Sequence, residues 1–88
     1  MNKATNWEDV SFVISSSYRK KVLGALEKPK TPSILSKELN INKTHISRAL
    51  SELEAKKIVK CLTPESAKGR LYLITNYGKK ILSKVSKI

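Results

Sequence analysis

Several residue types are scarce in this sequence, and each scarcity excludes a class of protein. The 88 residues include a single cysteine, Cys61, which excludes a disulfide within the chain and makes a reduced, cytoplasmic setting the expected one. No apolar run approaches the roughly 18 residues of a membrane-spanning helix, so we expect no membrane association. We also expect no signal peptide, because Glu8 and Asp9 precede the first apolar cluster.

Motifs that are typical of enzyme active sites are also scarce. The sequence has only three glycines and no glycine-rich phosphate loop, and it shows no nucleophile with a histidine at a readable spacing. His45 is the only histidine, and together with Cys61 it does not make a ligand set for zinc. We therefore predict no enzymatic activity, no metal site and no cofactor, and no small-molecule ligand is evident. Cys61 is expected to be a small apolar side chain rather than a redox sensor.

Acidic residues are few, while basic residues are abundant. Eighteen Lys and Arg against seven Asp and Glu give a formal net charge of +11. Residues 1–40 carry +3 and residues 41–88 carry +8. Such a positive field favours polyanions such as nucleic acid, and its centre is expected in the second half of the chain. Excess lysine that only keeps the protein soluble is the alternative explanation.

The first half of the chain contains the start and stop signals of three short helices. Asn6 can cap a helix that the serine cluster at 15–17 ends or bends, although "VSFVI" could also form a strand. An apolar stripe then predicts a helix from Tyr18 to Glu27. In "KTPSILSKELN", Thr31 is a good N-cap and Pro32 suits the first helical position. Asn40 follows the last apolar position, where a left-handed residue often ends a helix.

The stretch "NINKTHISRALSEL", residues 40–53, predicts a helix that Asn42 caps, with two different faces. One face gathers the apolar side chains Ile46, Ala49, Leu50 and Leu53. The opposite face carries Thr44, Arg48, Ser51 and Ala55, with His45, Ser47 and Glu52 on the flanks. An ion pair between residues four apart, which would stabilise the helix, is expected only near its end, between Glu52 and Lys56. The outer face is thus small and polar around one arginine.

Two β-rich runs, residues 58–62 and 70–74, flank a loop and predict a β-hairpin. Thr75 can then cap a last helix at about 76–87. A turn between two helices followed by such a hairpin predicts a winged helix-turn-helix. The fold class is therefore mostly α with a small β-hairpin. It comprises a three-helix core, a wing and flanking N- and C-terminal helices. We expect residues 1–88 to form a single domain, with the helix-turn-helix at about 31–57 and the wing at about 58–74.

The outer face of the 42–57 helix suits double-stranded DNA. An α-helix fits the major groove, where arginine can donate two hydrogen bonds to guanine while short hydroxyl side chains allow close approach. The free backbone N–H groups around Asn42, together with Lys43, would suit a phosphate. A basic hairpin loop can lie along the flanking backbone. The predicted DNA-binding residues are Asn42, Lys43, Thr44, His45, Ser47, Arg48, Ser51, Lys68 and Arg70.

Residues 17–82 resemble the ArsR/MarR-type winged helix-turn-helix transcription regulators, especially small archaeal and bacterial ones. "NKTHISRALSELEAKKIV" resembles that family's recognition helix, and "GRLYLITNYGKKIL" resembles the return strand of its wing and the start of its last helix. The resemblance implies sequence-specific binding of promoter DNA, with recognition-helix contacts at Lys43, Thr44, His45, Ser47 and Arg48 and wing contacts at Lys68 and Arg70. The chain departs from the family at two positions where glycine is usual, Asn40 in the turn and Lys57 at the end of the recognition helix.

Other interpretations remain open at this stage. A winged helix can also serve as a protein–protein docking module in a larger assembly, while RNA binding would need an aromatic strand platform that the sequence lacks. Arg19, Lys20 and Lys21 could contact phosphates or could simply solvate a helix. Trp7 and the apolar stripe of the last helix could complete the core or could pack against a twin. We expect the latter, a homodimer that matches a palindromic DNA site.

Overall fold

The chain forms five helices and two strands in a computed structural model that describes residues 6–66 and 69–86. Their bounds are α1 Trp7–Ile14, α2 Ser17–Gly24, α3 Pro32–Leu39, α4 Lys43–Ala55, β1 Val59–Cys61, β2 Tyr72–Ile74 and α5 Asn76–Ser86. The strands pair antiparallel, with Val59 opposite Ile74 and Cys61 opposite Tyr72. The fold is mostly helical with a small β-hairpin, and α3, α4 and the hairpin form a winged helix-turn-helix, as the sequence predicted.

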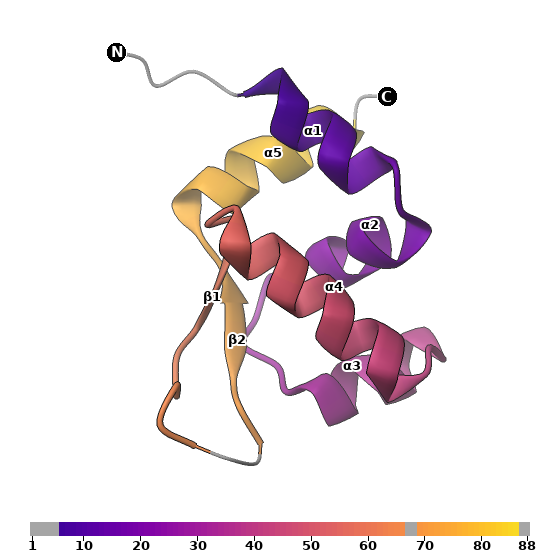
Figure 1. The fold of residues 1–88 in the computed structure, drawn as a ribbon, viewed down its shortest axis with the longest axis vertical. Coiled ribbons are helices and arrows are strands. Elements are labelled where there is room, and N and C mark those ends of the chain that lie inside the picture. The colour runs from indigo at the N-terminus through magenta and orange to yellow at the C-terminus, as the bar shows by residue number, and fades with distance from the viewer. Residues whose placement is uncertain (1–5, 67–68, 87–88) are drawn as a thin grey trace.

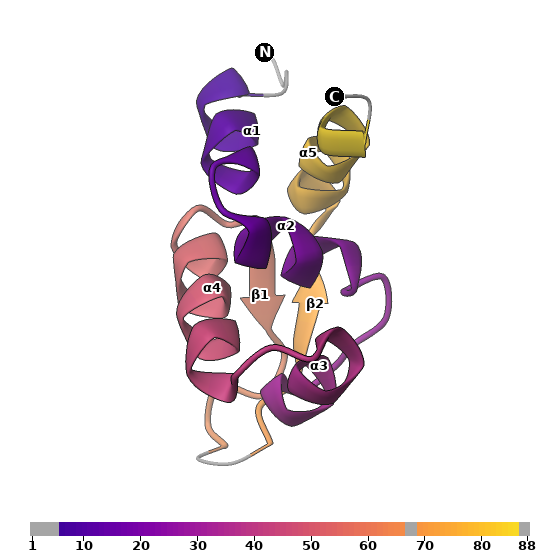
Figure 2. The same cartoon turned by 90° about the vertical axis from the view of Figure 1, so that its right-hand side faces the viewer.

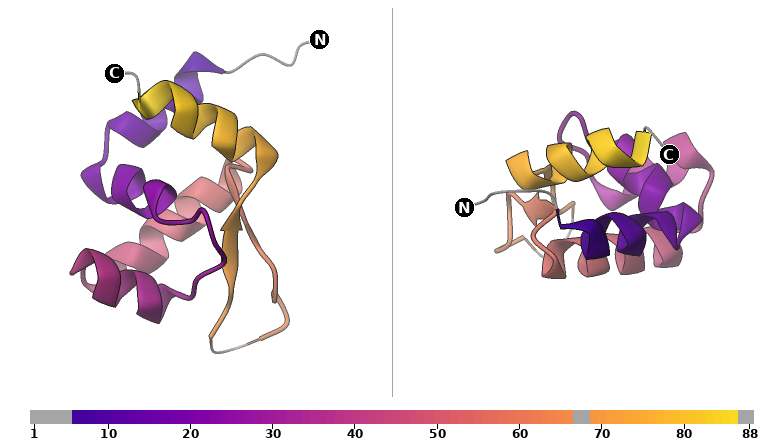
Figure 3. Two further views of the ribbon diagram at one scale, coloured as in Figure 1. Left: turned by 180° about the vertical axis from the view of Figure 1, so that it is seen from behind. Right: turned by 90° about the horizontal axis from the view of Figure 1, so that it is seen from above.

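The elements separate into two ends of an elongated molecule. Helix α4 packs against both α2 and α3, and the hairpin follows directly from it (Figure 1). Helices α1 and α5 pack against each other at the end remote from the hairpin loop (Figure 2). Figure 3 shows from behind that α2 lies between this helix pair and α3. The exposed side of the helix-turn-helix and the wing therefore occupy one end, and the chain-flanking helices occupy the other.

One apolar core joins all of these elements. Buried side chains come from every helix, from both strands and from the connections that follow α2, α3 and α4. They include Val10, Val13, Val22, Leu23, Leu26, Leu35, Ile41, Ile46, Leu50, Leu53, Ile58, Val59, Tyr72, Ile74, Ile81 and Val85. Burial of these side chains supplies the main favourable term in folding. The predicted apolar face of α4 contributes to this core. On α3, Leu35 is buried but Ile34 is 44% exposed. Ile81 and Val85 of α5 complete the core of a single chain, although we had expected the apolar stripe of this helix to pack against a twin.

The turn between α3 and α4 is built from its own sequence signals. The Thr31 hydroxyl accepts a hydrogen bond from the Ile34 N–H at 3.2 Å, and Pro32 begins α3. Asn40 takes the left-handed conformation with φ of 55°, and the next N–H, that of Ile41, returns to the Ser36 carbonyl at 3.1 Å. Ile41 is buried, so the turn is anchored to the core. The predicted N-cap at Thr31 and the predicted left-handed residue at Asn40 are both confirmed.

Helix α4 ends earlier than Lys57, where we had expected it to end. Lys57 has φ of 65°, the second left-handed position among the non-glycine residues described. Its N–H binds the Glu54 carbonyl at 2.9 Å, and the Ile58 N–H binds the Leu53 carbonyl at 3.0 Å. This is the Schellman pattern that closes a helix, and it usually places glycine at the left-handed residue. Lys57 thus lies two residues beyond the last helical residue, at the position where the family that the sequence resembles usually has glycine.

Helix α2 and both strands are shorter than expected, and one contact beside the hairpin was not expected. Helix α2 ends at Gly24 rather than Glu27, and the N–H groups of Ala25 and Leu26 then donate to carbonyls three residues back, which tightens the last turn. Lys30 then pairs with Tyr72, with N–H to carbonyl distances of 3.0 and 2.8 Å, as an isolated bridge beside β2. Each strand has three residues, although the Leu62 N–H still donates to the Leu71 carbonyl at 2.7 Å.

Helix α5 begins where Thr75 was expected to cap it. The Thr75 hydroxyl accepts a hydrogen bond from the Gly78 N–H at 2.9 Å and lies 2.9 Å from the Ile58 carbonyl oxygen. Gly78 is buried against the start of the hairpin, and a Cβ at this position would overlap the Ile58 carbonyl and come within 2.7 Å of Ile74 Cγ1. The absence of a side chain at Gly78 therefore allows α5 to pack closely against the end of α4 and the hairpin.

Candidate nucleic-acid interface

Helix α4 is held by its apolar face, and this leaves its polar face exposed. Ile46, Ala49, Leu50 and Leu53 are at most 2% exposed, so the predicted inner face is confirmed. Thr44, Arg48 and Ser51 are exposed on the outside, as predicted. Asn42 begins the helix, since its side-chain oxygen accepts a hydrogen bond from the Thr44 N–H at 2.9 Å. The orientation of this face is therefore fixed by packing rather than by surface contacts.

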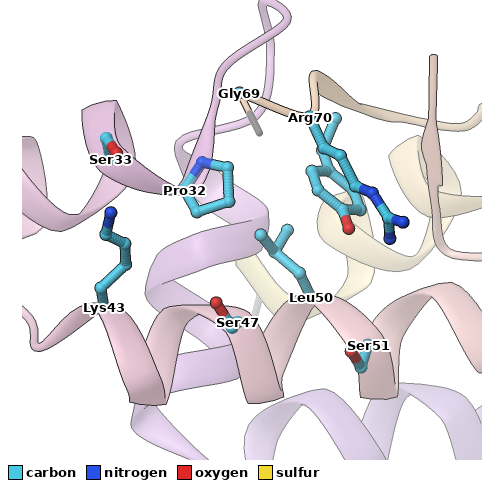
Figure 4. Close-up of a pocket in the computed structure, with 9 residues that line it drawn as sticks. Pro32, Ser33, Lys43, Ser47, Leu50, Ser51, Gly69 and Arg70 are labelled. Atoms are coloured by element: carbon cyan, nitrogen blue, oxygen red, sulfur yellow. The ribbon is translucent and has the colours of Figure 1, made fainter. Parts of the chain in front are cut away.

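One group of the predicted residues lines a groove between α4, the start of α3 and the wing. The groove has a volume of about 660 Å³ and is lined by Pro32, Ser33, Lys43, Ser47, Leu50, Ser51, Gly69, Arg70 and Tyr72. Figure 4 shows the side chains of Lys43, Ser47 and Ser51 projecting from α4 on the side of Pro32 and Arg70. Two cations and three serine hydroxyls thus border one groove, which matches the donors that a phosphate backbone needs.

The wing residue Arg70 is partly held by its own loop. Its Nε donates to the Ser66 carbonyl at 2.8 Å, and the side chain is exposed. The Leu71 N–H donates to the Thr63 hydroxyl at 3.0 Å and so extends the hairpin beyond its strands. Lys68, the other predicted wing contact, lies outside the described residues. The described part of the wing therefore contributes one cation, Arg70, to the groove.

Two further predicted residues, His45 and Arg48, face another hollow on the α2 side of α4, whereas Asn42 and Thr44 line neither space. His45 and Arg48 line it together with Ser16, Tyr18, Arg19, Ala49 and Glu52, and its volume is about 300 Å³. The His45 imidazole stacks on the Tyr18 ring, with ring centroids 4.6 Å apart and planes inclined by 20°. The structure thus divides the predicted contacts between two sides of α4. The partner of His45 could not be inferred from α4 alone, because Tyr18 comes from another helix.

Arg19 is fixed within the protein and does not project toward a phosphate, although the sequence allowed that possibility. Its Nε donates to Glu52 Oε1 at 2.9 Å, and its Nη1 donates to the Phe12 carbonyl at 2.7 Å and the Ser15 hydroxyl at 3.1 Å. Its guanidinium carbon also lies 3.8 Å from the centroid of the Phe12 ring. Arg19 therefore joins α1, α2 and α4.

The charge pairing of Glu52 also differs from the expectation. Glu52 binds Arg19 on α2, while Lys56 Nζ lies 3.8 Å from Asp9 Oδ1 on α1. The hydrogen bond from Arg19 is the main cause that lowers the pKa of Glu52, and the positive charges of Arg19 and Arg48 add to it, whereas burial opposes it. The expected Glu52–Lys56 pair along α4 is thus replaced by two pairs between helices.

A polar contact that sequence reasoning missed connects α1 with α5. The Tyr77 hydroxyl donates to Asp9 Oδ2, and Asp9 is only 7% exposed. Burial, then the hydrogen bond to Asp9 and its negative charge, raise the pKa of Tyr77 to about 12. Asp9 had been considered only as a charge near the chain start. The available signal was its position among the apolar residues of α1, between Trp7 and Val10.

The described residues offer little for other chemistries. Within residues 6–66 and 69–86, no three His, Cys, Asp or Glu side chains gather as metal ligands would. Cys61 is half-buried and packs against the core. Among the helices of the described part, none is long and apolar enough to cross a membrane. The polar surface of α4 and the adjoining groove is therefore the best candidate for a functional site.

Comparisons with known proteins agree with this fold. No protein-family model matches the sequence, and no characterised protein is significantly similar to it in sequence. Among solved structures, BldR, a transcriptional regulator from Sulfolobus solfataricus, superimposes with a TM-score of 0.76 at 19% identity over 92% of this chain. A cysteine-to-serine mutant of E. coli MarR complexed with operator DNA gives 0.73 at 26% identity over 91%.

A further match is a MarR family transcription regulator, with a TM-score of 0.75 at 22% identity over 91% of this chain. The chain spans 55%, 63% and 59% of the lengths of the MarR family regulator, BldR and the MarR mutant, respectively. These neighbours support the MarR part of the resemblance and give no specific support to the ArsR part. The chain thus has the winged-helix fold of MarR-family transcription regulators.

Proposed function

We propose that the protein is a sequence-specific double-stranded-DNA-binding regulator of transcription. Helix α4 enters the major groove, and the wing lies along the flanking backbone. The observation that carries the proposal is the exposed face of α4, where Arg48 stands among short polar side chains and the groove bordered by Lys43 and Arg70 lies on the side toward the wing. The likeness to MarR-family structures, one of them complexed with operator DNA, and the net charge of +11 support it.

The two sides of α4 suit different parts of a duplex. Lys43 and Arg70 border the groove toward the wing, where they can neutralise phosphates. Arg48 is exposed and makes no hydrogen bond or ion pair with any other described residue, so its guanidinium is free to bind guanine with two hydrogen bonds. The first side therefore positions the helix, and the second discriminates between bases.

The proposal is tested by titrating the purified protein with promoter-derived and scrambled duplexes at several salt concentrations. Specific binding should favour some duplexes, and the affinity should fall linearly with salt on logarithmic axes. Negligible affinity even at low salt would instead support a protein–protein docking module, the alternative that the winged-helix fold also permits. Equal affinity for every duplex would leave a nonspecific DNA-binding protein.

Two variants separate base recognition from phosphate binding. Arg48→Ala should cost about 1–3 kcal/mol on the preferred duplex and relax the preference for one base pair. Lys43→Ala should weaken all duplexes alike and reduce the salt slope by about one unit. Fluorescence anisotropy on matched duplexes that differ at single base pairs measures both effects. If Arg48→Ala weakened every duplex equally, the assignment of Arg48 to base recognition would be wrong.

We also propose that the protein acts as a homodimer joined through α1 and α5. Trp7 is 60% exposed on α1, and Ile14 and Leu82 are only partly buried at the same end of the molecule. This end is remote from the wing, so pairing there would leave both α4 helices free (Figure 2). A two-fold dimer could then present two recognition helices to a palindromic site.

A further inference from the structure

Helix α4 itself carries a carboxylate, that of Glu52, which could form an ion pair with Arg48. Glu52 follows Arg48 by four residues, and both side chains line the hollow on the α2 side of α4. Residues at this spacing are neighbours on a helix surface and can form an ion pair. Such a pair would direct the guanidinium along α4 and away from a base. Yet among the described residues the partner of Glu52 is Arg19, and Arg48 is unpaired.

Arg19 is well placed to retain Glu52. Its side chain is only 17% exposed, whereas that of Glu52 is 37% exposed, so the carboxylate meets its partner at the edge of the hollow. The Arg19 guanidinium is also oriented by contacts that do not involve Glu52. It donates hydrogen bonds to the Phe12 carbonyl and the Ser15 hydroxyl, and it lies over the Phe12 ring. Arg48 has no comparable support, so the pre-ordered arginine is favoured in the competition for the carboxylate.

We infer that Arg19 is a positioning residue for DNA recognition, because it holds Glu52 and thereby keeps that carboxylate from capturing Arg48. This inference rests on the proposed function of Arg48. It assigns a DNA-related role to a side chain that is held between α1, α2 and α4 and need not touch DNA. Loss of Arg19 leaves Glu52 free to pair with Arg48 across one helical turn, and this pair must break before Arg48 can bind a base.

The test measures the ratio of affinities for the preferred duplex and for the same duplex with the guanine contacted by Arg48 replaced. Arg19→Gln should lower this ratio about two- to fivefold, the range expected for a partly exposed ion pair. The double variant Arg19→Gln/Glu52→Gln has the net charge of the wild type and should restore the ratio. Arg19→Lys retains a cation for Glu52 and should keep most of the discrimination. In an Arg48→Ala background, Arg19→Gln should leave the ratio unchanged.

The outcomes separate this inference from the proposed function. An unchanged ratio in an Arg19→Gln variant that melts cooperatively would overturn the inference alone. The same holds if the double variant remained as impaired as Arg19→Gln, because Arg19 would then act through the fold and not through Glu52. Thermal melts of all variants identify any loss of structure. If the wild-type protein bound no duplex, the proposed function and this inference would both be wrong.

Discussion

At the scale of single residues, the most informative side chains are those whose partners come from distant parts of the chain. Asp9 accepts a hydrogen bond from the Tyr77 hydroxyl, and Arg19 forms an ion pair with Glu52. Each pair satisfies a charge that would be costly to bury alone. The two pairs differ in their pH dependence, because the pKa of Glu52 is lowered and that of Tyr77 is raised.

Tyr77 should make the stability of the protein fall at alkaline pH. Its folded pKa of about 12 lies above the ordinary value of 10.0, so the folded protein retains a proton that the unfolded chain releases. The contribution is fully present below pH 10 and is lost as pH rises toward 12. Urea denaturation at several pH values measures the free energy of unfolding. Tyr77→Phe should be less stable at neutral pH and lose less stability in this window; an identical alkaline loss would contradict the assignment.

At the scale of the elements, the two left-handed residues that follow α3 and α4 determine where these helices stop. Asn40 and Lys57 have φ of 55° and 65°, and both precede a buried isoleucine whose N–H returns to the helix. Asparagine tolerates this conformation, because its short polar side chain can hydrogen-bond locally. Lysine has no such compensation, so the end of α4 carries a local conformational cost.

Lys57→Gly should therefore stabilise the protein. The left-handed conformation costs a non-glycine residue about 1–2 kcal/mol, and glycine removes this cost. The greater freedom of glycine in the unfolded chain offsets roughly 0.5–1 kcal/mol of this stabilisation. We expect a net increase of up to about 1 kcal/mol in the free energy of unfolding, measured by denaturant titration. The matched variant Asn40→Gly should change stability by less. A destabilised Lys57→Gly would mean that the lysine side chain makes a compensating interaction.

At the scale of the whole molecule, the two ends have different surfaces. The end formed by α3, α4 and the wing presents polar and cationic side chains around a groove. The end formed by α1 and α5 exposes Trp7, whose ring lies 5.8 Å from Lys84 Nζ. Tryptophan is enriched at protein–protein interfaces, so the exposed ring supports the proposed contact between two copies.

Trp7→Glu should shift the proposed dimer toward monomers, because a buried carboxylate without a partner disfavours the interface. Sedimentation equilibrium over a range of protein concentrations measures the association constant. Ile34→Glu is the matched control, since Ile34 is 44% exposed on α3 at the other end of the molecule. The control should leave the association constant unchanged. A wild-type protein that sediments as a monomer at all concentrations would contradict the dimer proposal.

The sequence by itself determined the features that depend on local chemistry. Thr31, Pro32, Asn40 and Asn42 specify the helix-turn-helix, because caps, a fixed φ and a tolerated left-handed residue act within a few positions of the chain. The apolar spacing of α4 fixed which face is buried and therefore which polar side chains are exposed. The candidate DNA-binding face could be predicted for the same reason.

Only the tertiary structure decided which elements those side chains meet. The sequence could not show that Lys43 and Arg70 border one groove while His45 stacks on Tyr18 in another hollow. It also could not show that Glu52 prefers Arg19 to a partner on its own helix. These pairings depend on how α2, α4 and the wing pack against one core, and long-range packing decides distances that residue spacing leaves open.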